Sequence, residues 1–202
     1  MIEDKHMHTI TLLMKSVEEK DRYTFGHSDR VAWIGSILAE FCPGISQETV
    51  YSCGLIHDVG KLRISDEILL KNGTLTKEEY QIMKTHPREG ADICLMNGVS
   101  SELVDGVLYH HERWDGRGYP YGLDQNDIPL IGRIISVADS LDAMASNRPY
   151  RNALHMEKIK NEVLEGRGAQ FDPYVIDIVL HQWEKLTQLL VEGIKHPMSK
   201  QV

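Results

Sequence analysis

Seven histidine and aspartate side chains, spread over five short motifs, have the chemistry to bind divalent metal ions. The motifs are Gly26-His27-Ser28, His57-Asp58-x-Gly60-Lys61, His86-Pro87, His110-His111-Glu112 and Ala138-Asp139. Imidazole and carboxylate ligands together suit iron, manganese or zinc better than a soft thiolate site would. Two such ions a few ångströms apart form a clamp for in-line attack on phosphate esters. The pattern predicts a two-metal site with these ligands: His27, His57, Asp58, His86, His110, His111 and Asp139.

The spacing around His57 and Asp58 favours joint use of the two side chains. Adjacent residues leave a helix about 100° apart, so the pair can hold one ion from two sides. Asp58 has two oxygens and could bridge two metals. Lys61 follows three residues later on the same face, where it can neutralise a phosphate oxygen or the leaving group. A lone His-Asp pair is more often an incidental surface feature, so its function depends on the other motifs.

The other predicted ligands differ in how strongly each one, taken alone, indicates a metal site. His110 and His111 end an apolar helical stretch, where each buried imidazole needs a partner that a metal would supply. Asp139 lies in a very apolar helix, where an unpaired carboxylate would cost several kcal/mol. His27 and His86, alone, would be ordinary polar residues near helix ends. We expect Asp142 and Asp115 to support the metal ligands from outside, as orienting groups.

Two further segments favour a phosphorylated ligand. Residues 112–129 form a long loop rich in glycine and proline, which in a compact domain is usually functional. Arginines such as Arg148 and Arg151 recognise phosphate through paired hydrogen bonds. A solvated charged turn would normally be the better interpretation of such a run. Its position just after a predicted ligand favours substrate binding.

Composition limits the remaining classes of function. The net charge of −8 argues against binding to a nucleic-acid polymer or an anionic membrane. Cys42, Cys53 and Cys94 lack metal-site spacing and are typical of buried free thiols in a reducing cytoplasm. We find no signal peptide, and the most apolar stretch is too short to cross a bilayer. These features predict a soluble, cytoplasmic protein.

The elements that must position these residues are almost all helices. Apolar residues recur at helical spacing, and Thr76-x-x-Glu79 is a capping box that opens the helix expected to reach His86. A brief strand near Leu62-Arg63-Ile64 is the one candidate exception. We therefore predict a single all-α bundle, with residues 1–22 as an N-terminal helix that could be a connector and 23–202 as one catalytic domain. The expected helices cover about 3–21, 27–41, 46–57, 76–86, 100–111, 130–144, 154–165 and 173–192, and a further helix is expected to start at Pro87.

In order and spacing, the motifs resemble those of one family, the HD-GYP subfamily of the HD-domain phosphohydrolases. The resemblance runs from about Glu18 to Pro173. Its most specific part is the run from His110 to Pro120. The quoted motifs also include Asp21-x-Tyr23-Thr24-x-Gly26-His27-Ser28, His57-Asp58-Val59-Gly60-Lys61, His86-Pro87-x-x-Gly90, Ala138-Asp139-x-x-Asp142-Ala143 and Arg148-Pro149-Tyr150-Arg151.

The resemblance implies an all-α domain with a di- or trinuclear centre, usually of iron or manganese, although zinc, nickel, magnesium or cobalt could serve. It implies that one metal is held by His27, His57, Asp58 and Asp139, and the other by Asp58, His86, His110 and His111. Tyr23 stands where members with a third metal carry glutamate, which favours two metals. It further implies that the ligand is bound by Lys61, Gly118, Tyr119, Pro120, Arg148 and Arg151.

The implied activity is hydrolysis of cyclic di-GMP to pGpG or GMP, with Asp58 and Lys61 as catalytic residues. By analogy, the Gly118-Tyr119-Pro120 loop could also contact a diguanylate-cyclase (GGDEF) partner, and the first helix could form a homodimer contact. Two alternatives stay open. One is a phosphohydrolase for another cyclic dinucleotide or nucleotide. The other is a non-catalytic sensor that binds cyclic di-GMP and signals through a partner protein.

Overall fold

The computed structural model describes residues 2–21, 25–147 and 152–192, and within these ranges the chain is helical with no β-strand. The single bridge between Arg167 and Phe171 is isolated. The elements are α1 (Ile2–Lys20), α2 (His27–Ala39), α3 (Gln47–Ile56), the 3-10 helix η2 (Val59–Arg63), α4 (Asp66–Leu69), α5 (Lys77–Met83), α6 (His86–Met96), α7 (Ser101–Tyr109), η3 (Gln125–Asp127), α8 (Leu130–Ala145), α9 (Met156–Gly166), α10 (Pro173–His181) and α11 (Trp183–Glu192).

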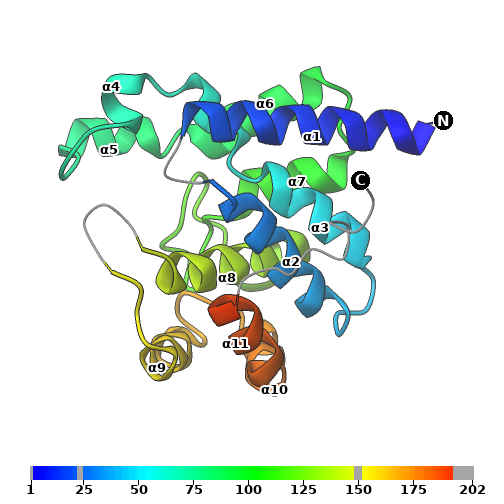
Figure 1. Ribbon diagram of the computed structural model, residues 1–202, viewed down its shortest axis with the longest axis vertical. Helices are drawn as coiled ribbons and strands as arrows, with labels where there is room; N and C mark the ends of the chain where they lie inside the picture. The colour runs from blue at the N-terminus through cyan, green and yellow to red at the C-terminus, as the bar shows by residue number, and fades with distance from the viewer. Residues whose placement is uncertain (1, 22–24, 148–151, 193–202) are drawn as a thin grey trace.

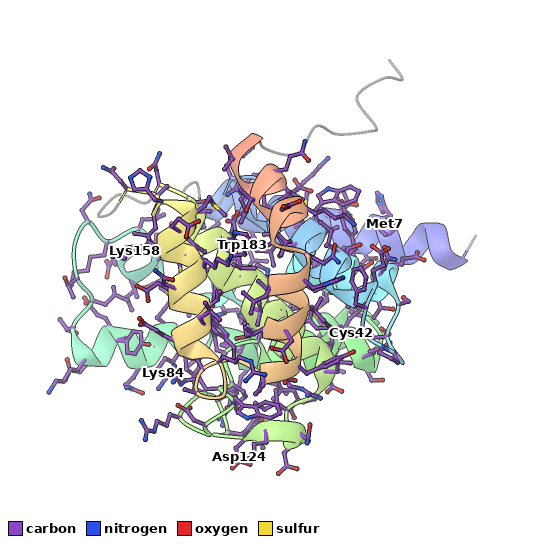
Figure 2. The ribbon with its side chains drawn as sticks, turned by 90° about the horizontal axis from the view of Figure 1, so that it is seen from below. Met7, Cys42, Lys84, Asp124, Lys158 and Trp183 are labelled. Atoms are coloured by element: carbon purple, nitrogen blue, oxygen red, sulfur yellow. The ribbon has the colours of Figure 1, made fainter. Side chains whose placement is uncertain are left out.

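Helix α8 is the central element, and the predicted all-α bundle is built around it. Ile134, Ile135, Val137 and Leu141 of α8 are fully buried. Helices α2 and α7 pack against α8, and α3 packs against both α2 and α7 (Figure 1). Helices α9 and α10 lie side by side next to α8, as the view from below shows (Figure 2).

Local signals set several helix starts. Ser46 accepts a hydrogen bond from Thr49 N and opens α3, as its sequence indicates. Thr76 and Glu79 form the predicted capping box of α5. That helix ends at Met83 and does not reach His86, which is instead the first residue of α6 and precedes Pro87. His86 therefore lies at a helix N-terminus.

Two further expectations about elements were wrong. Residues 62–64 do not form a strand, because Val59–Arg63 is a 3-10 helix and the carbonyls of Leu62 and Ile64 accept hydrogen bonds from Lys20 Nζ. The expected last helix, 173–192, is broken at Gln182 into α10 and α11. The break allows Val179 of α10 and Leu186 of α11 both to be fully buried in the core around α8.

Helix α1 shares this core. Its Ile10 and Val17 are buried, and the helix packs against α3 and η2. Its role as a connector stays a prediction. Cys42, Cys53 and Cys94 are free and buried, as expected. Within the described ranges, no helix has both the length and the apolar character needed to cross a membrane.

Close backbone approach explains one glycine of the His57 motif. A Cβ atom at Gly60 would collide with the carbonyl oxygen of His86 and crowd Gly90 N. Glycine at this position therefore lets η2 lie directly against the start of α6. This contact brings the segment that carries Asp58 and Lys61 next to His86.

Candidate metal centre

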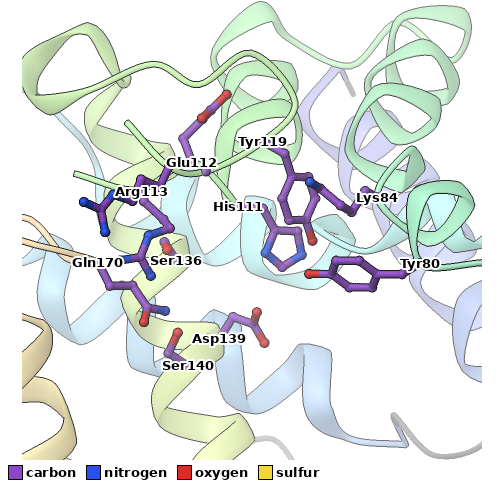
Figure 3. Close-up of a pocket in the computed structure, with 12 residues that line it drawn as sticks. Tyr80, Lys84, His111, Glu112, Arg113, Tyr119, Ser136, Asp139, Ser140 and Gln170 are labelled. Carbon is purple, nitrogen blue, oxygen red and sulfur yellow. The ribbon is translucent and has the colours of Figure 1, made fainter. Parts of the chain in front are cut away.

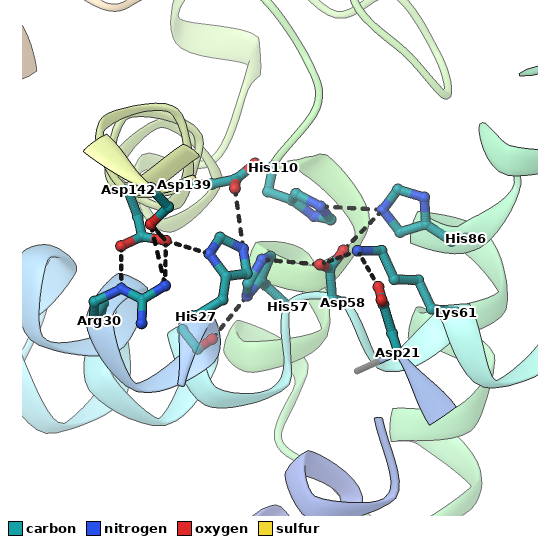
Figure 4. Close-up of polar contacts among 12 residues, drawn as sticks. Asp21, His27, Arg30, His57, Asp58, Lys61, His86, His110, Asp139 and Asp142 are labelled. Carbon is teal, nitrogen blue, oxygen red and sulfur yellow. Dashed lines mark hydrogen bonds and ion pairs between the residues drawn. The ribbon is translucent and has the colours of Figure 1, made fainter. Parts of the chain in front are cut away.

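The first group of potential ligands joins three helices. His27 begins α2, His57 follows the end of α3, and Asp139 lies in the middle of α8. One ligand atom from each of these residues lies within 4.8 Å of the other two. His27 Nε2 is 3.3 Å from Asp139 Oδ1 (Figure 4). Residues more than a hundred positions apart in the chain are thus brought into one cluster, which we call cluster A.

A second group lies beside the first. His86 at the start of α6 and the pair His110 and His111 after α7 again bring three ligand atoms within 4.8 Å of one another. His86 Nε2 is 3.3 Å from His110 Nε2. We call this group cluster B. The rings of His57 and His110 meet edge to face at 5.3 Å between centroids, so the two clusters are neighbours.

Asp58 lies between the clusters and presents one oxygen to each. Its Oδ1 is 3.3 Å from His86 Nε2 in cluster B, and its Oδ2 is 3.5 Å from His57 Nε2 in cluster A (Figure 4). Asp58 is buried, so its negative charge needs partners of opposite sign. This geometry suits a carboxylate that bridges two cations.

Backbone hydrogen bonds orient three of the histidine rings in the same way. In each ring Nδ1 is hydrogen-bonded to the backbone carbonyl oxygen three residues earlier, at 2.7 to 2.9 Å. The pairs are His57 with Gly54, His86 with Met83 and His110 with Val107. A carbonyl oxygen only accepts, so Nδ1 carries the proton in each neutral ring. The lone pair of each Nε2 therefore points toward the clusters, as metal ligation requires.

The arrangement of these lone pairs fits bound metal ions. His57 Nε2 is buried and has no hydrogen-bond partner. His86 Nε2 and His110 Nε2 direct two lone pairs at each other across 3.3 Å. Both features cost free energy in a protein interior, because no donor satisfies the nitrogens. A divalent cation in each cluster would satisfy all three atoms, so the residues present fit a metal-binding site.

The histidines of cluster B are held neutral. Burial, with a contribution from His111, lowers the pKa of His110 well below its usual range. Burial and the nearby His86 lower the pKa of His111 to about 3. Burial also lowers the pKa of His86. Neutral imidazole is the form that binds metal, so no proton has to leave these rings near neutral pH.

Charge is distributed differently around cluster A. Burial disfavours a charged His27, but hydrogen bonds to Asp139 and Asp142 outweigh burial and raise its pKa to about 9. Burial works against ionisation of Asp139, yet His27 holds the pKa of that carboxyl far below its usual range. For Asp58, burial is likewise outweighed by Lys61 and His57, so its pKa is also well below normal.

Asp142 orients the His27 ring from behind. Its Oδ2 accepts a hydrogen bond from His27 Nδ1 at 2.6 Å. Arg30 donates to both oxygens of Asp142, at 2.5 and 3.1 Å, and Ser146 Oγ donates at 3.3 Å. Asp142 is only 1% exposed, so the carboxylate is fixed by these partners. A carboxylate behind a ligand histidine is a common support of metal sites.

Lys61 is held between two carboxylates. Its Nζ is 2.8 Å from Asp58 Oδ2 and 3.2 Å from Asp21 Oδ2. Burial disfavours the charged amine, but Asp58 and Asp21 outweigh burial and raise the pKa of Lys61 above its usual value. An ammonium has three N–H donors, so one remains for another acceptor after these two contacts.

A pocket of about 320 Å³ opens onto the clusters at His111 and Asp139 (Figure 3). In the figure, Tyr80 and Lys84 lie on one side of it, and Arg113 and Gln170 on the other. Gly118 and Tyr119, which the sequence predicts as ligand-binding residues, line it. The full lining is Tyr80, Lys84, His111, Glu112, Arg113, Arg117, Gly118, Tyr119, Ser136, Asp139, Ser140 and Gln170.

The glycine-rich loop is attached firmly to the site. The Tyr119 ring stacks on His111, with 4.8 Å between centroids and 28° between planes. Glu112 Oε1 accepts hydrogen bonds from Tyr121 N and Gly122 N. A Cβ atom at Gly118 would collide with the backbone of residues 111–113. Glycine here makes room for the chain's own backbone next to His111.

The remaining predicted residues lie as follows. Asp115 forms a paired contact with Arg113, at 3.0 and 2.7 Å, and accepts from Arg117 N, so its bonds support the pocket wall rather than a ligand histidine. The Pro120 carbonyl accepts from Arg88. Arg148, Arg151 and Tyr23 lie outside the described residues.

Sequence reasoning assigned no role to several residues of the site. Arg30 and Asp21 were missed because each acts through a partner distant in the chain, Asp142 and Lys61 respectively. Tyr80 and Lys84 were missed because an exposed helix with charged residues is usually a solvated surface. The one available signal was the position of Lys84 two residues before His86.

Comparisons with known proteins identify the family and several relatives of this chain. A family model described as "HD domain" matches residues 11–175. A cyclic di-GMP phosphodiesterase of Thermotoga maritima is 39% identical over 193 residues, which are 93% of this chain and 52% of that protein. A 3'3'-cGAMP-specific phosphodiesterase of Vibrio cholerae is 34% identical over 86% of this chain and 34% of that protein.

A similar fold is found in a solved structure. The crystal structure of a cyclic GMP-AMP-specific phosphodiesterase of V. cholerae superposes with a TM-score of 0.67 at 19% identity, over 90% of this chain and 50% of that chain. The chain spans about half the length of the Thermotoga protein and about a third of the Vibrio relative. With the family model covering most of its residues and the histidine and aspartate clusters in place, this chain belongs to the HD-domain family.

Proposed function

We propose that this chain is a metal-dependent phosphodiesterase that hydrolyses cyclic di-GMP to pGpG, GMP or both. The observation that carries the proposal is the pair of ligand clusters with Asp58 between them, since a two-metal centre is suited to phosphate-ester hydrolysis. The name of the Thermotoga relative supports cyclic di-GMP as the substrate.

We propose that the centre holds two divalent ions, iron or manganese before zinc, nickel, magnesium or cobalt. His27, His57, Asp58 and Asp139 would hold one ion, and Asp58, His86, His110 and His111 the other. When bound, the ions would supply Lewis acidity that activates water and neutralises phosphate charge. The mixed imidazole and carboxylate donors of the clusters support this choice of metals.

The chain's own residues would then bind and orient the substrate. Lys61 keeps one N–H donor beyond those directed at Asp58 and Asp21, and this donor would stabilise charge on the scissile phosphate. Gly118 and Tyr119 would form one wall of the substrate pocket. Arg148 and Arg151 stay predicted phosphate ligands, on the sequence alone.

A second candidate substrate is another cyclic dinucleotide, 3'3'-cGAMP. The Vibrio relative named for this substrate covers 86% of the chain at 34% identity, which is close to the identity of the Thermotoga relative. The two molecules differ in one base, so residues of the pocket would decide between them rather than the metal clusters.

The prediction that the glycine-rich loop also contacts a diguanylate-cyclase partner belongs to this proposal. Gly118 is turned against the chain's own backbone, whereas Tyr121 is 55% exposed. Tyr121 is therefore an exposed aromatic side chain of this loop that a partner could contact. Loss of GGDEF-protein capture in a Tyr121→Ala variant would support the contact.

The decisive experiment measures metal content and hydrolysis together. The chain is purified anaerobically, loaded with Mn²⁺ or Fe²⁺, analysed for metal, and incubated with cyclic di-GMP or 3'3'-cGAMP before chromatography of the products. We expect about two metal ions per chain and hydrolysis of cyclic di-GMP that a chelator abolishes. Binding of cyclic di-GMP by the metal-loaded chain without turnover would instead favour the non-catalytic sensor.

A further inference from the structure

Lys84 stands out among the residues of the pocket because no described acidic residue neutralises it. It follows the last residue of α5, is partly buried and lines the pocket wall. Its ammonium lies over two aromatic rings, at 4.8 Å from the centroid of Tyr119 and 5.8 Å from that of Tyr80. Within the described ranges, Lys84 Nζ has no hydrogen bond and no ion pair.

The other cations of the pocket are differently placed. The guanidinium of Arg113 is occupied by its paired contact with Asp115. Arg117 is exposed. Lys61 does not line the pocket and is paired with Asp58 and Asp21. Among the described cations that line the pocket, Lys84 is therefore the partly buried one that is not paired with a carboxylate.

The rings hold this ammonium in place without neutralising it. Tyr119 is itself fixed by stacking on His111. A cation over aromatic faces keeps its full positive charge while losing part of its hydration. Such a group is prepared to bind an anion, because part of the desolvation cost has already been met in the folded protein.

A cyclic dinucleotide carries two phosphates, and the reaction at the clusters uses one of them. The pocket meets the clusters at His111 and Asp139, and Lys84 lies beside Tyr119, which stacks on His111 (Figure 3). We propose that Lys84 binds the phosphate that is not being hydrolysed, an inference that rests on the proposed function. Lys84 thereby selects substrates with a second phosphate over simple phosphodiesters.

The test compares two substrates in three variants: Lys84→Met, Lys84→Arg and Lys77→Met. Methionine keeps the length of the side chain and removes its charge. Lys77 is an exposed lysine at the first position of α5, the helix that Lys84 follows, and serves as the matched control. The substrates are cyclic di-GMP, with two phosphates, and bis-p-nitrophenyl phosphate, with one.

We expect Lys84→Met to raise the KM for cyclic di-GMP by about tenfold or more, the usual effect of losing a hydrogen bond to a charged group. The kcat for cyclic di-GMP, and both constants for bis-p-nitrophenyl phosphate, should change by less than about threefold. Lys84→Arg should retain most of the affinity. Equal losses on both substrates, or a KM for cyclic di-GMP that is the same in Lys84→Met and Lys77→Met, would overturn the assignment.

Equilibrium binding separates this inference from the proposed function. Calorimetric titration of the metal-loaded chain with cyclic di-GMP should show affinity about tenfold weaker in Lys84→Met than in Lys77→Met, whether or not turnover occurs. Equal affinities in these two variants would disprove the role of Lys84, but they would not contradict the proposed phosphodiesterase activity. If the unaltered chain neither binds nor hydrolyses cyclic di-GMP, both proposals fail together.

Discussion

Asp58 is the residue on which the chemistry of the site converges. It contacts Lys61, and its two oxygens face different ligand clusters. Removal of this carboxylate would leave His57 and His86 without their shared neighbour and Lys61 with Asp21 as its remaining acidic partner. The positions of both metals and of the lysine therefore depend on a single side chain.

We predict that Asp58→Ala lowers metal content below one ion per chain and abolishes hydrolysis of cyclic di-GMP, because a shared ligand is lost from both clusters. Helical content measured by circular dichroism should stay near normal, since the core around α8 is untouched. Unchanged metal content in the variant would rule out the bridging role.

Asp142 is not one of the proposed metal ligands, and it acts through the ligand His27. We predict that Asp142→Ala weakens metal affinity by about 10- to 100-fold, because the His27 ring loses the acceptor that sets its orientation. A chelator competition titration measures this change. The control is Asp177→Ala, which removes another carboxylate paired with an arginine, Arg167, but on the exposed surface. If both variants bind metal equally well, the orienting role is wrong.

At the scale of elements, the glycine-rich loop and the end of α7 form one unit. The Tyr119 ring covers His111, Glu112 holds the far side of the loop through two backbone N–H groups, and Gly118 fits against the backbone between them. The family resemblance implies that Gly118 binds the ligand. In the structure it makes room for the segment that carries a metal-binding histidine.

We therefore predict that Gly118→Ala displaces His111 and reduces hydrolysis of both cyclic di-GMP and bis-p-nitrophenyl phosphate. The added Cβ should also lower the free energy of unfolding by roughly 1–3 kcal/mol, the usual cost of overpacking. Denaturant unfolding and activity assays measure the two effects. Gly73→Ala is a control, because a Cβ there meets no atom within 4 Å, although its φ of 120° adds some backbone strain. Loss of cyclic di-GMP turnover alone would show that Gly118 serves the substrate instead.

At the scale of the whole molecule, the two clusters connect several helices of the bundle. Their ligands come from α2, α6 and α8 and from the ends of α3 and α7. Without a cation, these helices meet at facing lone pairs and at an unpartnered buried nitrogen. Metal binding to the folded chain should therefore stabilise the entire fold and not only the site.

Thermal unfolding with and without metal checks this expectation. At a free Mn²⁺ concentration of about 100 times Kd, the folded state gains roughly 2.7 kcal/mol. For a chain of this size, that gain should raise the Tm by about 5–11 °C, and a chelator should reverse the shift. The Asp58→Ala variant should show little of it. A Tm that does not respond to metal in the unaltered chain would contradict the site.

How much of this could be predicted from the sequence depends on distance along the chain. The capping box of Thr76 and Glu79 rests on neighbouring residues, so the sequence predicted it correctly. The end of the 3-10 helix at Val59–Arg63 accepts hydrogen bonds from Lys20, about forty residues away, and the break at Gln182 accompanies burial of Val179 and Leu186 in the core. Local pattern carries no information about such contacts.

The residues of the candidate site likewise fall into those that the sequence could predict and those that it could not. Metal-binding residue types are rare enough that their motifs could be recognised without knowing how the helices pack. Lys84 and Arg30 are ordinary types on helices with exposed faces. Their importance appears only when Tyr119 is brought next to Lys84 and Asp142 next to Arg30.

The end of α1 is hydrogen-bonded to the segment that carries Lys61. Lys20 Nζ donates to the carbonyl oxygens of Leu62 and Ile64, at 2.9 and 2.7 Å, and Asp21 accepts from Lys61 itself. This helix end and the lysine predicted to face the phosphate are thus mechanically linked by hydrogen bonds. Any rotation or sliding of α1 must either break those bonds or move the ammonium with it.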